Sequence, residues 1–196
     1  MGWMDIFKRK KTEPAQQSEQ HKDSKLSPNV LNLSVFVDGP NILSWDEKID
    51  LQYLKQKVSD MGKIKIARVY LKNPDPDIMR KTHQSNAENI IKREIDHIAS
   101  VKKMSEKAGF EVDDDSFKDI DAKMIVDVVS EIYEGNIDGI VLATRDKDFK
   151  WVMKKAKEKG KKVILAAPQE YLPDDLKSIA DKYIYLKFKK TILKNI

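Results

Sequence analysis

Carboxylates follow directly after two apolar, β-rich runs of the sequence. Asp38 comes after the run 33–37, and Asp146 and Asp148 come after the run 140–143. If both runs are parallel strands of one α/β sheet, their carboxyl ends line the crevice where ligands bind. Carboxylate oxygens gathered there need a hard cation, and Mg²⁺ or Mn²⁺ prefers such ligands. The spacing therefore predicts chemistry on phosphate.

A fourth carboxylate, Asp121, lies in the segment 118–121 at the predicted start of a helix. Crowded carboxylates repel one another, so the cluster costs stability unless a metal neutralises it. Phosphodiester cleavage uses such a metal to hold the phosphate, activate a water molecule and stabilise the leaving oxygen. We therefore predict a Mg²⁺ or Mn²⁺ site whose catalytic and metal-binding residues are Asp38, Asp121, Asp146 and Asp148.

Each of these side chains also fits an ordinary structural role. Aspartate is common in turns, and acids are favoured in the first turn of a helix. Asn41 and Thr144 are both suited to capping a helix. Their place after apolar strands favours a site, so we predict that both support it.

Four further polar residues stand near these motifs. Asp127 lies six residues after Asp121, on the polar side of the same predicted helix as Lys123. Arg145 and Lys147 flank Asp146. Cations at these positions are suited to holding a phosphodiester backbone, and they equally fit an ordinary charged surface. We predict that Lys123, Arg145 and Lys147 bind substrate.

The elements that must position these residues alternate along the chain. Apolar runs and helical periodicity predict strands at 33–38, 64–71, 110–112, 138–143, 163–167 and 183–186, and helices at 47–60, 77–108, 121–134, 147–158 and 174–181. Strands separated by helices favour a doubly wound, mostly parallel sheet with helices on both faces. The buried stripe of the long helix 77–108 is expected at Ile91, Ile95, Ile98, Val101 and Ala108. In the helix 121–134 the expected inward residues are Ile125, Val128, Val129 and Ile132.

Composition narrows the classes of function. The chain has 196 residues, of which 40% are hydrophobic and 35% charged, and it has no cysteine. Disulfides, zinc–thiolate sites, iron–sulfur clusters and thiol catalysis are therefore excluded. A cysteine-free chain fits a reducing compartment, and we expect a cytoplasmic protein.

The charge is concentrated at the two ends of the chain. Of the formal net charge of +5, residues 1–30 carry +2 and residues 187–196 carry +4, which leaves −1 for the middle. We predict a basic N-terminal segment and linker at 1–29, a folded domain at 30–187 and a basic tail at 188–196. The apolar cluster and cations of residues 1–11 are typical of a segment that touches a membrane surface. The tail is suited to clamping RNA or to homo-oligomer formation.

Three motifs resemble, in order, those of NYN domains, the PIN-like nuclease group that includes LabA-like proteins. Residues 36–42 are similar to the family's F-I-D-G-x-N-L start. Residues 118–121, with Asp127 six positions on, are similar to K-G-V-D…D, and residues 140–149 are similar to a-i-L-v-S-G-D-x-D-F. Two family glycines are replaced, by Asp119 and Arg145, but each carboxylate of the motifs is present.

The resemblance implies a Rossmann-like PIN fold, a Mg²⁺ or Mn²⁺ site and cleavage of RNA, most simply single-stranded. By motif position it assigns the metal site to the four aspartates already named, and it gives Asn41, Thr144 and Asp127 supporting roles.

The sequence was also compared with three other classes of function. A non-catalytic RNA-binding or regulatory module is compatible with the basic ends. A phosphatase or phosphotransfer domain is disfavoured, because Pro40 stands where such domains place a second acid. A mononucleotide-binding domain lacks its glycine-rich motif here.

Overall fold

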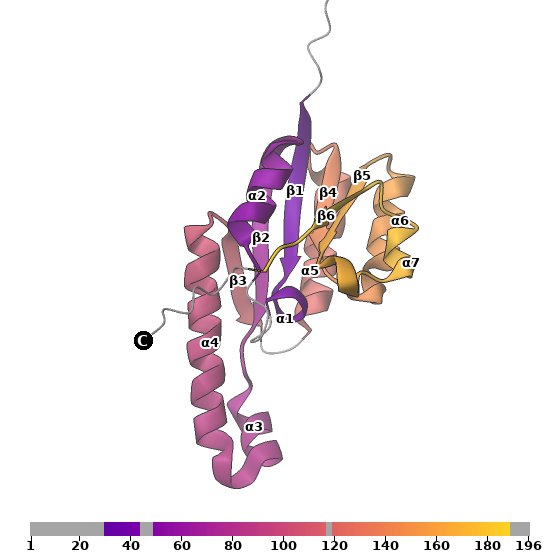
Figure 1. The fold of residues 1–196 in the computed structure, drawn as a ribbon. Coiled ribbons are helices and arrows are strands. Elements are labelled where there is room, and N and C mark those ends of the chain that lie inside the picture. Colours follow the sequence, from indigo (N-terminus) through magenta and orange to yellow (C-terminus); the bar gives the residue numbers. More distant parts are fainter. Residues whose placement is uncertain (1–29, 44–48, 117–118, 189–196) are drawn as a thin grey trace, which may run out of the picture.

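The computed structural model describes residues 30–43, 49–116 and 119–188. The segment 1–11, the start of the helix expected at 47–60, Lys118 and the tail after Phe188 lie outside the described residues. Within them, six strands form one sheet in the order β3-β2-β1-β4-β5-β6, and every neighbouring pair is parallel (Figure 1). The strands are β1 (Leu31–Asp38), β2 (Gly62–Lys72), β3 (Glu111–Ser116), β4 (Gly139–Ala143), β5 (Lys162–Ala167) and β6 (Lys182–Tyr185).

Helices cover both faces of this sheet. They are α1 (Gly39–Ile42), α2 (Leu51–Ser59), α3 (Pro76–His83), α4 (Ala87–Lys107), α5 (Ile120–Glu134), α6 (Lys150–Glu158) and α7 (Asp174–Lys177). On one face α2 packs on β2 and α4 on β2 and β3; on the other, α5 packs on β1, β2 and β4, beside α6, which packs on β5. The doubly wound α/β fold expected from the sequence is confirmed.

The central strands form because they can be buried on both faces. The last six residues of β1 and all five of β4 are buried, as are the last five of β5. Strands covered on both faces read as continuous apolar runs, which is why their positions were predictable. This core holds the carboxyl ends of β1 and β4 side by side.

The strand order reverses direction between β1 and β4. From β1 the chain adds β2 and then β3 on one side, and afterwards β4, β5 and β6 on the other. In open α/β sheets, ligands bind outside the carboxyl ends of the strands at such a switch point. The candidate carboxylates follow the two strands that flank it.

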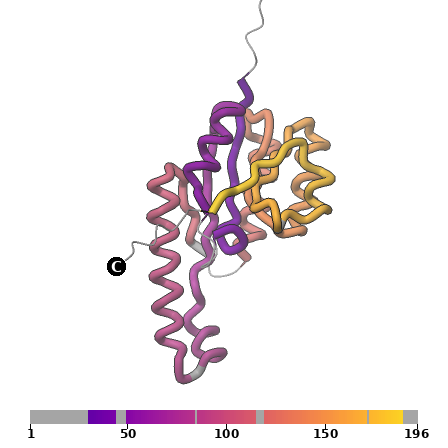
Figure 2. The backbone as a smooth tube through the Cα atoms, in the orientation of Figure 1, coloured from indigo at the N-terminus to yellow at the C-terminus, as the bar shows by residue number. Residues whose placement is uncertain are grey.

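The prediction of a single long helix at 77–108 is wrong. A 3₁₀ turn, Gln84–Asn86, separates α3 from α4, and the pair reaches beyond the carboxyl edge of the sheet as an arm (Figure 2). α4 is about 31 Å long, against about 20 Å for β3, so its first turns have no sheet to pack on. Ile95, expected in the buried stripe, is accordingly 50% exposed.

Smaller differences concern helix starts and inward faces. The helix expected at 147–158 begins with the 3₁₀ turn Lys147–Phe149 before α6. In α5, Met124 is buried with Val128, whereas Ile125 and Val129 are only partly buried. Among the helices of the described residues, none is long and apolar enough to cross a membrane.

Candidate functional site

The carboxylate of Asp38 is the centre of the candidate site. It ends β1 and is only 2% exposed. Its Oδ2 accepts a hydrogen bond from Thr144 Oγ1 at 2.8 Å, and its Oδ1 accepts one from the backbone N–H of Asn41 at 3.2 Å. Burial raises its pKa to about 6 against the lowering effect of these hydrogen bonds, and the nearby charges of Asp121 and Asp146 add to the rise.

Thr144 links the ends of β1 and β4. It is fully buried, and its hydroxyl both donates to Asp38 and accepts the backbone N–H of Asp146 at 3.0 Å. Asp146 in turn accepts the backbone N–H of Asp148 at 2.9 Å and caps the 3₁₀ turn. Asp146, rather than Thr144, is therefore the capping residue, and Thr144 joins Asp38 to the backbone of Asp146.

Asn41 is held from the other side by Arg145. The backbone N–H of Arg145 donates to Asn41 Oδ1 at 2.8 Å, its Nε donates to the same oxygen at 3.3 Å, and its Nη2 donates to the backbone carbonyl of Asn41. The cation that replaces a family glycine thus ties the turn after β4 to α1. Asp38, rather than Asn41, caps α1.

Asp121 reaches the same region from the first turn of α5. Its side chain is largely exposed to solvent. The part of it that is desolvated, and secondly the charge of Asp146, raise its pKa. Lys72, at the end of β2, lowers that pKa, and Asp148 raises it again. The charges of Asp121 and Asp146 therefore act on Asp38, and those of Asp146 and Asp148 act on Asp121.

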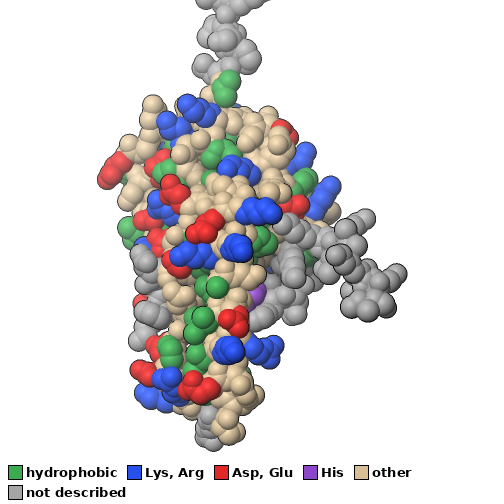
Figure 3. Space-filling view, turned by 90° about the vertical axis from the view of Figure 1, so that its left-hand side faces the viewer, with side chains coloured by type: hydrophobic (Ala, Val, Ile, Leu, Met, Phe, Trp, Pro, Cys, Tyr) green, Lys and Arg blue, Asp and Glu red, His purple; other side chains and the backbone are tan. Residues whose placement is uncertain are grey.

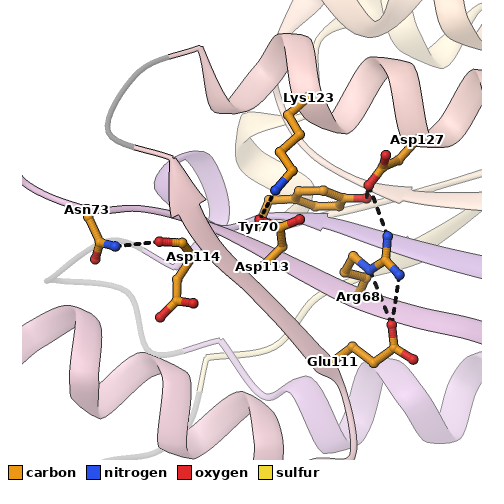
Figure 4. Close-up of polar contacts among 8 residues, drawn as sticks. All are labelled: Arg68, Tyr70, Asn73, Glu111, Asp113, Asp114, Lys123 and Asp127. Carbon is orange, nitrogen blue, oxygen red and sulfur yellow. Dashed lines mark hydrogen bonds and ion pairs between the residues drawn. The ribbon is translucent and has the colours of Figure 1, made fainter.

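Asp127 lies in a different contact network, shown in Figure 4. Its Oδ2 accepts hydrogen bonds from Tyr70 Oη at 2.8 Å and from Arg68 Nη1 at 3.0 Å. Arg68 also bonds Glu111 of β3 at 2.9 Å. Burial and the hydrogen bond to Asp127 both raise the pKa of Tyr70, so its hydroxyl keeps its proton. The network fastens α5 to β2.

Two of the three cations expected at the substrate make contacts within the protein. Lys123 forms an ion pair with Asp113 at 2.6 Å, as Figure 4 also shows. Arg145 donates hydrogen bonds to Asn41. Lys147, by contrast, is exposed beside Asp146 and Asp148.

Arg68, Tyr70 and Lys72 were missed by sequence reasoning. They occupy alternate positions of β2, so their side chains share one face of the strand. The available signal was that Arg68, Tyr70 and Lys72, each with a polar end, alternate with the buried apolar residues Val69 and Leu71. In the register of the sheet, Tyr70 lies directly beside Asp38.

A cavity of about 450 Å³ adjoins the site on the side of the arm. It is lined by Gly39 and Pro40, by Lys72 at the end of β2 and Asn73 after it, and by side chains of α3 and α4 that are apolar except for Glu94 and His97. Gly39 is required here, because an added Cβ would lie 2.3 Å from the carbonyl oxygen of Tyr70.

The candidate ligands are chemically suited to a hard divalent cation, because they are carboxylate oxygens. Burial first and repulsion between these carboxylates second raise the pKa values of Asp38 and Asp121; a bound cation relieves that repulsion. In the part of the chain that the structure describes, no group of three or more acidic or histidine side chains is close enough to hold an ion. Binding would therefore require these side chains to turn toward one another.

Known proteins are similar to this chain in sequence or in fold. The chain is 34% identical over 152 residues to the uncharacterized protein MJ0482 of Methanocaldococcus jannaschii, a match that covers 78% of this chain and 54% of that protein. A crystal structure of a protein of unknown function, VPA0982 from Vibrio parahaemolyticus, has a TM-score of 0.60 at 16% identity. That likeness covers 81% of this chain and 94% of the other, and it supports the fold alone. Because residues 32–187 match the model of the NYN domain, the chain belongs to the NYN domain family.

Proposed function

We propose that this protein is a metal-dependent ribonuclease whose site lies at the carboxyl ends of β1 and β4. The observation that carries the proposal is the buried carboxylate of Asp38, with a pKa raised to about 6 and two further carboxylates near it. Buried groups with strongly shifted pKa values are concentrated at functional sites. The NYN family belongs to the PIN-like nuclease superfamily, whose members generally use divalent metals.

In this proposal the four aspartates hold Mg²⁺ or Mn²⁺. The bound cation would polarise the scissile phosphate and make a water molecule more acidic. Thr144 fixes the orientation of Asp38, and Asn41, held by Arg145, supports the turn beside it. Asp127 acts indirectly, since its bonds to β2 keep the first turn of α5, and with it Asp121, in place.

The substrate would approach from the exposed side of the carboxylates. Lys147 and Lys72 are both exposed there and are suited to phosphate oxygens. The cavity beside Gly39 has room for one nucleotide next to the cleaved bond. Lys123 would contact RNA only after release from Asp113, so we assign it mainly to positioning β3.

A second candidate is a non-catalytic RNA-binding or regulatory module. The absence of a ready-made group of metal ligands among the described side chains favours it. It predicts RNA binding that falls steeply with salt and does not require a divalent cation.

Two finer assignments accompany the main proposal. We place the chain with the LabA-like proteins, because the three motifs occur in the order found there. We also propose a cytoplasmic location, on the basis of the cysteine-free composition.

The test is cleavage of an end-labelled single-stranded RNA in Mn²⁺, Mg²⁺ or EDTA. We expect cleavage by the wild type in a divalent cation, and loss of at least about 100-fold in Asp38→Asn and Asp146→Asn. Asp96→Asn, which makes the same change at an exposed position of α4, is the matched control. RNA binding without cleavage in any metal, or cleavage that survives both site variants, would reject the ribonuclease in favour of the binding module.

A further inference from the structure

An exposed tryptophan stands between two lysines at the start of α6. Trp151 is 64% exposed, which is unusual for a side chain of its size. The Nζ atoms of Lys150 and Lys154 lie 5.2 and 4.8 Å from the centre of its ring. Both distances are within the range of a cation–π contact. An exposed aromatic ring with two ammonium groups close to it is therefore presented to solvent.

This ring lies directly beside the candidate site. The backbone is helical from the 3₁₀ turn Lys147–Phe149 onward into α6. Residues three apart on such a backbone are surface neighbours, with Cβ atoms about 5–6 Å apart. Trp151 is three residues after Asp148, so the two positions are neighbours on the helix surface.

A second aromatic residue with a lysine stands at the other end of the same helix pair. Tyr133 of α5 is 52% exposed, and the Nζ of Lys159 lies 4.3 Å from its ring centre. α5 and α6 pack against each other, and each runs from the carboxyl edge of the sheet to its other edge. Trp151 and Lys159 are about 12 Å apart along the helix axis. The two pairs thus mark a strip that leads away from the carboxylates.

The charge of this strip favours a polyanion. Residues 147–162 contain eight lysines and two acids. One of the acids, Asp148, belongs to the site, and the other, Glu158, is paired with Lys155 at 2.5 Å. The face of the molecule around α3 and α4 looks different, because blue and red side chains alternate over it (Figure 3). Lys157 is also paired, with Asp181, so the excess positive charge of this segment comes from its remaining lysines.

Exposed aromatic rings and lysines together match single-stranded nucleic acid. Bases stack on aromatic faces while lysines follow the phosphates, and every base has a face that can stack. A duplex keeps its bases stacked on one another and offers only its backbone to such a surface. The apolar side chains of α6, Val152, Met153 and Ala156, face the core, so the helix has no apolar stripe left for a membrane.

We propose that Trp151 is a stacking platform for an unpaired base next to the cleaved phosphate, and that the strand continues over α6 toward Tyr133. The location beside the carboxylates rests on the proposed nuclease function. The platform itself binds without a cation and without sequence preference. It would select single-stranded over double-stranded substrate and set the register of the cleaved bond.

The test uses the intrinsic fluorescence of Trp151. Trp3 and Trp45, which lie outside the described residues, are replaced with phenylalanine so that Trp151 is the sole tryptophan. Oligo(U) of ten nucleotides is titrated in EDTA, where no metal-dependent cleavage occurs. We expect saturable quenching that a duplex of the same length does not produce.

Affinity is then compared by anisotropy of labelled oligo(U). We expect Trp151→Ala to weaken binding roughly 5- to 100-fold and Trp151→Phe to retain most of it. The double variant Lys150→Gln, Lys154→Gln should reduce the slope of log affinity against log salt concentration by about one. Tyr185→Ala, which removes a 44% exposed ring from β6, is the matched control and should leave the affinity unchanged.

The outcomes separate the platform from the nuclease. Quenching of Trp151 without any cleavage in metal supports the platform and rejects only the nuclease. Cleavage without quenching, or equal affinities of Trp151→Ala and Tyr185→Ala, overturns the platform and leaves the nuclease standing. Failure of the sole-tryptophan protein to bind oligo(U) at low salt also overturns it.

Discussion

Replacing Asp38 with asparagine should stabilise the metal-free protein at neutral pH. Burial raises the pKa of Asp38 from 3.8 to about 6. Because the folded state has the higher pKa, the penalty is absent below pH 3.8 and grows as the pH rises toward 6. At about 1.36 kcal/mol per pH unit, it reaches about 3 kcal/mol above pH 6.

Asparagine carries no charge, so this penalty disappears in the variant. Its amide also makes a poorer partner for Thr144, at a cost of about 1 kcal/mol that does not change with pH. We therefore expect the free energy of unfolding of Asp38→Asn, relative to wild type, to rise by about 2.5 kcal/mol between pH 4 and pH 7.5. Groups that titrate equally in both proteins cancel in this difference.

The assay is urea unfolding followed by circular dichroism in EDTA at both pH values. Asp96→Asn again serves as the control, since it removes an exposed charge on α4 and should show no such pH dependence. Millimolar Mn²⁺ at pH 7.5 should stabilise the wild type but not Asp38→Asn, because only the wild type gains a neutralising ion. A difference between variant and wild type that is the same at pH 4 and pH 7.5 would refute the reasoning.

Three further substitutions test the contacts around the site. Gly39→Ala places a Cβ 2.3 Å from the carbonyl oxygen of Tyr70, so we expect a loss of about 2 kcal/mol in urea unfolding, and an unchanged midpoint would contradict the close approach. Thr144→Val removes the hydrogen-bond donor to Asp38. The free energy of unfolding should fall by about 2 kcal/mol at pH 7.5 but clearly less at pH 4, where Asp38 is largely protonated. Equal losses at the two pH values would argue against this bond. Asp119 has a φ of 50°, so Asp119→Gly should be more stable than Asp119→Ala by about 1 kcal/mol in thermal unfolding, and the reverse order would show that the left-handed backbone is not retained.

The sheet was predictable because its central strands are buried on both faces. The runs that end at Asp38 and Ala143 are short and apolar, and turn or helix signals follow each one. Local pattern therefore located the strands, and the rule of parallel connections arranged them. The segment Gln84–Asn86 had no proline or glycine to indicate the break between α3 and α4. Residues 80–86 also contain no apolar side chain that could reveal a change of face, so two helices were expected as one.

The candidate site was predictable in its residues but less so in its contacts. Asp38, Thr144 and Asp146 each follow an apolar strand, and that local position is visible in the sequence. The partners of Arg145 and Asp127 depend on chain segments 104 and 59 residues away. No periodicity encodes such pairs. The cations expected at the substrate were thus assigned by charge alone, whereas the fold decides which of them remain exposed.

The strand order also has a consequence for how the chain folds during synthesis. β1 is made first, yet one of its two neighbours, β4, is completed only at residue 143, and the hydrogen bond between Asp38 and Thr144 spans 106 residues. A nascent chain that has emerged from the ribosome beyond residue 116 but not as far as residue 143 can pair β1, β2 and β3 but leaves the other edge of β1 open. An open apolar edge is a template for pairing with other chains, and contacts of long sequence separation form slowly. Ribosome-bound intermediates of this length are where we expect chaperone dependence and aggregation to be greatest.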